Sequence, residues 1–153
     1  MPWPTQLHKL VGDDADDYWT EVIRRTQTHP HEAGVQGNYG QTALHVACYR
    51  FPPTAAVEAL LRAYPTCAVL TNHSGETPLH LATEGASETI QMMILQAGPL
   101  AASKRDKYGD TPLHLMCGAG QSSLRMIRCK CYFISINFYL NYNESIHDWH
   151  SLS

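Results

Sequence analysis

The chain has 153 residues, a length typical of one domain. Hydrophobic residues make up 44% of it and charged residues only 16%, so the chain can bury a core. The net charge of −3 excludes a generally basic surface of the kind that binds nucleic acid. No apolar run approaches the ~20 residues that span a bilayer, and the first residues lack the apolar stretch of a secretory signal. We therefore expect no nucleic-acid partner and no membrane insertion.

The N-terminal region carries one amphipathic pattern. Trp19, Val22 and Ile23 follow the i, i+3, i+4 spacing of a helix with one apolar face. No first helix of a pair is evident before this segment. The pattern predicts a flexible N-terminus over residues 1–12, followed by a lone outer helix.

Three later segments share one pattern: GQTALHVAC at 40–48, GETPLHLAT at 75–83 and GDTPLHLMC at 109–117. Their Thr residues are separated by 35 and 34 residues, and a Gly stands two positions before each Thr. A Pro also stands twelve residues before each Thr, and an Ala stands nine before it. Agreement at this many offsets indicates an internal repeat, which is typical of a solenoid.

Each repeat is interpreted as two short helices. Thr77-Pro78 and Thr111-Pro112 have the form of an N-cap followed by Pro at the first helical position. The second helices show an apolar face at helical spacing. Its residues are Val57, Leu60 and Leu61 in one repeat, and Ile90, Met93 and Ile94 in the next.

The G-x-T-P-L-H-x-A pattern at this period resembles the ankyrin repeat over roughly residues 16–127. The resemblance implies an all-α solenoid of stacked helix pairs with β-hairpin-like loops that project to one side. We assign residues 13–128 to this ankyrin-repeat domain. The resemblance also implies binding of another protein, since most ankyrin proteins are adaptors without catalytic activity.

The repeat fails after Ile127, where the composition changes. Residues 129–153 contain no Ala, Gly or Pro, although the whole chain has ten Gly and nine Pro. One hypothesis is that this atypical tail is a disordered segment or a gene-model artefact, with further repeats in the real protein. The alternative is a genuine capping tail, because the apolar residues from Ile134 to Tyr142 alternate as in a strand. Its aromatic, weakly charged sequence predicts poor solubility, which removal of the tail would improve.

Candidate catalytic and metal-binding residues are few. His45, His80 and His114 recur once per repeat, and helices packed ~8–10 Å apart hold them too far apart to share a zinc ion. The family resemblance gives them a structural role, as imidazoles that tie neighbouring loops by hydrogen bonds. Cys129 and Cys131 have an unusual spacing for zinc ligands. We expect no metal, no cofactor and no enzymatic activity, because no nucleotide-binding or hydrolase motif occurs.

The resemblance places partner-binding residues on the loop tips and on the faces of the first helices. Tyr and Arg are prominent in such a set because they are enriched at interface hot spots. The predicted residues are Asn38, Tyr39, Gln41, Tyr49, Arg50, His73, Ser74, Glu76, Glu84, Lys107, Tyr108 and Asp110.

The function that the resemblance implies is that of a non-enzymatic scaffold or adaptor that binds another protein through its loop tips and concave face. The alternative is a truncated fragment of a larger ankyrin-containing protein whose activity lies in a missing domain. Five Cys, an odd number without secretory context, predict reduced thiols and an intracellular location, cytoplasmic or nuclear. We expect a monomer.

Overall fold

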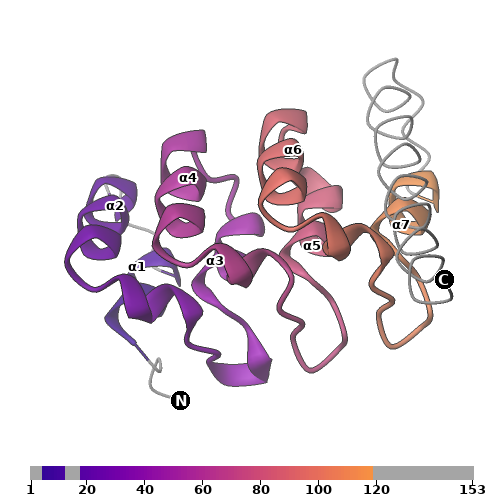
Figure 1. Ribbon diagram of the computed structural model, residues 1–153, viewed down its shortest axis with the longest axis horizontal. Coiled ribbons are helices and arrows are strands. Elements are labelled where there is room, and N and C mark those ends of the chain that lie inside the picture. Colours follow the sequence, from indigo (N-terminus) through magenta and orange to yellow (C-terminus); the bar gives the residue numbers. More distant parts are fainter. Residues whose placement is uncertain (1–4, 13–17, 119–153) are drawn as a thin grey trace, which may run out of the picture.

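The computed structural model describes residues 5–12 and 18–118, which form a row of short helices (Figure 1). The α-helices are α1 (Gln6–Gly12), α2 (Tyr18–Thr28), α3 (Ala43–Cys48), α4 (Thr54–Ala63), α5 (Pro78–Gly85), α6 (Glu88–Ala97) and α7 (Pro112–Gly118). The 3-10 helices are η1 (Pro30–Gly34), η2 (Asn38–Gly40), η3 (Pro65–Ala68) and η4 (Pro99–Ser103). The described residues contain no strand.

The α-helices stack in two layers. In the inner layer α1 packs on α3, α3 on α5 and α5 on α7. In the outer layer α2 packs on α4 and α4 on α6. The loops that precede α3, α5 and α7 project to the opposite side from the outer helices (Figure 1). The predicted all-α solenoid of stacked helix pairs is confirmed.

Helix α1 corrects the prediction for the N-terminus. Residues 6–12 were expected to be flexible, but they form a helix that packs on both α2 and α3. The expectation that the following outer helix stands alone is therefore also wrong. Leu7 and Val11 of this helix are fully buried. Thr5-Gln6-Leu7-His8 is a degenerate copy of the Thr-Pro-Leu-His segment, and the side chains of Thr5 and His8 are hydrogen-bonded at 2.7 Å. Helix α2 is therefore the second helix of a pair.

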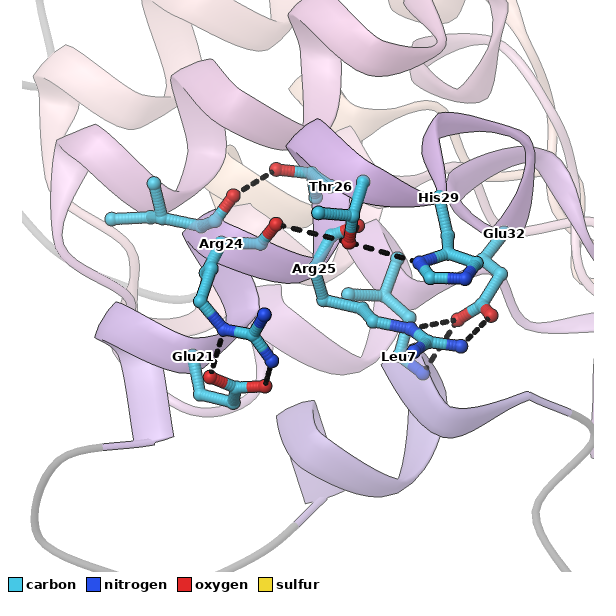
Figure 2. Close-up of polar contacts among 9 residues, drawn as sticks. Leu7, Glu21, Arg24, Arg25, Thr26, His29 and Glu32 are labelled. Atoms are coloured by element: carbon cyan, nitrogen blue, oxygen red, sulfur yellow. Dashed lines mark hydrogen bonds and ion pairs between the residues drawn. The ribbon is translucent and has the colours of Figure 1, made fainter.

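Glu32 joins α1 and α2, the two helices of this first pair (Figure 2). Its carboxylate pairs with Arg25 of α2 at 2.5 Å and accepts a hydrogen bond from the backbone N–H of Leu7 at 3.0 Å. Glu32 is only 6% exposed, and a carboxylate this buried needs such partners. The hydrogen bond from Arg25 is the main cause that holds the pKa of Glu32 below its usual value.

The core runs along the whole stack. The Val57, Leu60, Leu61 face is buried as predicted, and Ile90 and Ile94 are buried on α6, whereas Met93 is only partly buried. The repeated Pro and Ala positions form the 3-10 turns: Pro30, Pro65 and Pro99 begin η1, η3 and η4, and Ala33, Ala68 and Ala102 are fully buried in them.

The predicted tail at 129–153 lies outside the described residues, as do the first and last parts of the predicted domain, 13–17 and 119–128. The hypotheses on the tail and on Cys129 and Cys131 therefore stay predictions.

Candidate functional site

The three projecting loops are built alike. One backbone hydrogen bond closes each of them, from an N–H to the carbonyl oxygen four residues later. The donor and acceptor pairs are Gly37 and Gln41 at 2.7 Å, Asn72 and Glu76 at 2.9 Å, and Asp106 and Asp110 at 2.9 Å. The predicted hairpin-like loops therefore exist as closed turns without strands in the described residues.

Neighbouring loops are joined to one another through the backbone. The N–H of His73 donates to the carbonyl oxygen of Tyr39 at 2.8 Å, and the N–H of Lys107 donates to that of Ser74 at 2.8 Å. These bonds cross from one repeat to the next. The loop tips consequently form a continuous row whose spacing is set by hydrogen bonds, which is favourable for a preorganised binding surface.

The recurring Gly of each loop allows this close approach. Gly40 and Gly75 adopt φ values of +73° and +78°, a left-handed conformation that L side chains rarely adopt. A Cβ added at Gly75 would also lie 3.1 Å from the Cα of Asp106 in the next loop. Both the turn and the contact between loops therefore favour Gly at this position.

Asn72 and Asp106 shape the loops and were missed by the sequence reasoning. The Asn72 side-chain oxygen accepts from the N–H groups of Ser74 and Glu76 at 2.9 and 3.0 Å. Asp106 accepts in the same way from Tyr108 and Asp110, at 2.9 Å each. Both residues stand five positions before a repeated Thr, so the offset was a usable signal.

Buried histidines link each first helix to the next loop. His45 and His80 are fully buried, and their Nε2 atoms lie 3.1 Å from the carbonyl oxygen of Glu76 and 3.2 Å from that of Asp110. His8 makes the equivalent contact with the carbonyl oxygen of Gln41 at 3.0 Å. The predicted structural role of the repeated histidines is confirmed for His45 and His80. His114 is exposed and, within the described residues, bonds only to Thr111.

Burial lowers the pKa of these imidazoles because it disfavours the charged form. The pKa of His45 is lowered to about 4, and the pKa values of His8 and His80 are lowered from the same main cause. All three therefore stay neutral at neutral pH, as suits a ring that contributes one donor and one acceptor.

The structure places the predicted binding residues on the loops and at the ends of the first helices. Seven of them are exposed: Asn38, Tyr39, Tyr49, His73, Glu84, Lys107 and Tyr108. The other five are half-buried: Gln41, Arg50, Ser74, Glu76 and Asp110. The exposed fractions of Tyr39 and Tyr108 are 75% and 78%, so neither ring contributes much to the core. The Lys107 ammonium lies 4.9 Å from the centre of the Tyr108 ring.

Phe51 is an exposed aromatic residue that the sequence reasoning missed. It is 73% exposed and adopts a φ of +49°. Tyr49, two residues earlier, is 52% exposed, and its pKa is raised mainly by partial burial and further by the charges of Glu76 and Glu84. Aromatic and acidic groups therefore meet where α3 ends beside α5.

Among residues 5–12 and 18–118, no three His, Cys, Asp or Glu side chains are grouped so that they could hold a metal ion. No helix within these residues is both long enough and apolar enough to cross a membrane.

A family model for ankyrin repeats in three copies matches residues 18–100. The chain belongs to the ankyrin-repeat family. No curated protein matches the sequence. The ankyrin architecture extends beyond the matched range at both ends, since α1 and α7 stack on α3 and α5. Ankyrin repeats are in general protein–protein interaction modules and are typically not enzymes.

Proposed function

We propose that this chain is a non-enzymatic scaffold or adaptor that binds another protein through its row of loop tips and the adjoining faces of α3 and α5. The observation that carries the proposal is the exposure of Tyr39 and Tyr108 on loops that hydrogen bonds hold in register. Rigid, exposed Tyr rings provide large contact areas at a small entropic cost.

The proposal extends to the state of the protein. We propose a monomer that acts inside the cell with reduced thiols. Cys48 and Cys67 are free and buried, which is compatible with this environment. Burial raises the pKa of Cys67 to about 12, so its thiol is inert rather than nucleophilic.

The test is partner binding by the full chain and by a double variant, Tyr39→Ala with Tyr108→Ala. Proteins captured by the full chain are identified, and the dissociation constant of each is measured with both forms. Loss of both rings is expected to weaken binding by about 1–4 kcal/mol, roughly fivefold to a thousandfold in Kd.

The control is Arg62→Ala, which truncates an exposed side chain on the outer helix α4. It is expected to leave the Kd within twofold of the parent. Equal affinities of the double variant and the parent, with both proteins folded, would place the binding surface elsewhere. A partner lost equally with Arg62→Ala would point to the outer layer instead.

A further inference from the structure

Phe51 has an unusual backbone conformation that burial in the core does not explain. A bulky L residue at φ +49° is strained, and such strain persists where the surrounding structure imposes it, often at functional sites. Burial does not repay the strain, because 73% of the residue is exposed. The outlier therefore marks a place where an exposed aromatic ring is held by its surroundings.

The ring is held against the next repeat. A Cβ added at Gly85, the last residue of α5, would lie 2.7 Å from Cε1 of Phe51. The edge of the ring therefore rests where Gly85 has no side chain. Glu84 is the residue before Gly85 and is exposed, and 73% of Phe51 is likewise open to solvent.

Two carboxylates and a second aromatic ring belong to the same two neighbouring repeats. Glu84 is exposed and forms no hydrogen bond or ion pair with any residue that the structure describes. The Glu76 carboxylate is fixed by a hydrogen bond from the Asn72 side chain at 2.8 Å. Partial burial is the main cause that raises the pKa of Tyr49, and the charges of both carboxylates raise it further. We call Tyr49, Phe51, Glu76 and Glu84 the α3–α5 corner.

The chemistry of this corner selects a planar cation. Aromatic faces attract cations, and Arg does so more often than Lys. A guanidinium group can also stack on a ring while it donates two parallel hydrogen bonds to a carboxylate. Arg50 lies between Tyr49 and Phe51 in sequence, and it already takes part in an interaction of its own.

We propose that the α3–α5 corner is a subsite for an arginine side chain of the partner protein, stacked on Phe51 and paired with Glu84. This inference rests on the proposed function and names one chemical feature of the partner. Glu76 and Tyr49 add negative potential and an aromatic wall beside the guanidinium group.

The test is an NMR titration of the full chain with the peptide acetyl-Gly-Ser-Arg-Gly-Ser-amide. The same peptide with citrulline, a neutral isostere of arginine, is titrated in parallel. Backbone amide shifts are expected at residues 49–51 and 84–86 with the arginine peptide, and at least fivefold weaker binding with the citrulline peptide. Equal binding of the two peptides, or no shifts at these residues, would overturn the proposal.

Variants separate the two parts of the subsite. Glu84→Gln is expected to weaken binding of the arginine peptide at least fivefold. Glu58→Gln makes an equal change of net charge on the outer helix α4 and should leave the Kd of the peptide within twofold. Phe51→Leu keeps an apolar side chain against Gly85 but removes the aromatic face, and it should also weaken binding. Unchanged affinity of either Glu84→Gln or Phe51→Leu would overturn the proposed contact.

Phe51→Gly tests whether the ring has a structural role instead. Glycine adopts positive φ readily, so this variant should have a melting temperature at least as high as that of the parent. It should no longer bind the arginine peptide. A clearly lowered melting temperature together with unchanged peptide binding would make Phe51 a structural residue and overturn the proposal. Failure of the subsite is distinct from failure of the proposed function, because partner capture that depends on Tyr39 and Tyr108 would persist without any response to arginine.

Discussion

The Nε2 atom of His45 lies 3.1 Å from the carbonyl oxygen of Glu76, in the loop of the following repeat. On the other side of the ring, Nδ1 accepts a hydrogen bond from the backbone N–H of Thr42 at 3.1 Å. Nδ1 must therefore be unprotonated, and Nε2 carries the hydrogen that is donated to Glu76. One neutral imidazole thus caps its own helix and joins two repeats, and a second proton would break the capping bond.

This arrangement predicts that stability falls as the pH is lowered from 7 to 5. The pKa of His45 is about 4 in the folded chain, below its ordinary value of 6.5, so the unfolded state binds more protons in this range. His45 alone is expected to lower the free energy of unfolding by about 2 kcal/mol between pH 7 and pH 5. His8 and His80, whose pKa values are also lowered, add to the loss.

Urea unfolding at pH 7, 6 and 5 measures the effect. The variant His45→Gln is expected to be less stable at pH 7 but to lose less on acidification, because its side chain does not titrate. A parent chain whose free energy of unfolding is the same at pH 7 and pH 5 would contradict the proposed protonation states.

His80 and His114 can be compared to measure what the hydrogen bond between repeats contributes to stability. His80 is fully buried and reaches the carbonyl oxygen of Asp110, whereas His114 is exposed and bonds locally to Thr111. His80→Ala is expected to cost about 2–3 kcal/mol, because it leaves buried polar groups unpaired. His114→Ala should cost about 1 kcal/mol or less. Equal losses in the free energy of unfolding, measured with urea at pH 7, would show that the hydrogen bond between repeats contributes no stability beyond that of the helix cap.

Gly75 and Gly109 form a second matched pair. Both adopt positive φ, at +78° and +88°, so replacement by Ala costs about 1–2 kcal/mol of backbone strain at either site. A Cβ at Gly75 would also press on the Asp106 backbone at 3.1 Å, whereas one at Gly109 meets no atom of the described residues within 4 Å. Gly75→Ala is therefore expected to lower the melting temperature more than Gly109→Ala, and the reverse order would contradict the packing of the loops.

The sequence predicted the parts of the fold that recur at a constant offset. Thr42 could be assigned as a helix cap because the same residue type returns in the next repeats, and the family resemblance implied that His45 joins neighbouring loops. Helix α1 was missed because Thr5 lies 37 residues before Thr42, and Gln6 replaces Pro at the first helical position. Local spacing does not predict that Leu7 and Val11 pack on later helices, since burial is a tertiary property.

The candidate site was predicted less completely than the fold. The resemblance to ankyrin repeats placed Tyr39 and Tyr108 on exposed loop tips, and both rings are exposed. Asn72 was overlooked because the equivalent position in the first repeat is Gly37, so its role does not recur in all three loops. Phe51 was overlooked because neither its positive φ nor its contact with Gly85 of the next repeat recurs at a fixed offset in the sequence.

Leu79 and Leu100 differ in their contribution to the core of the stack. Leu79 follows the Thr-Pro cap of α5 and is fully buried, whereas Leu100 is 51% exposed on η4. Leu79→Asp buries a carboxylate without a partner, which costs several kcal/mol out of the ~5–15 kcal/mol that a domain of this size has. Because each repeat is stabilised by its neighbours, loss of the central one should unfold the described stack as a whole. Circular dichroism is expected to show loss of helix for Leu79→Asp and a spectrum like that of the parent for Leu100→Asp, with a melting temperature within a few degrees of it. A Leu79→Asp protein that keeps the helical spectrum and the melting temperature of the parent would contradict the buried position of Leu79 between the inner helices.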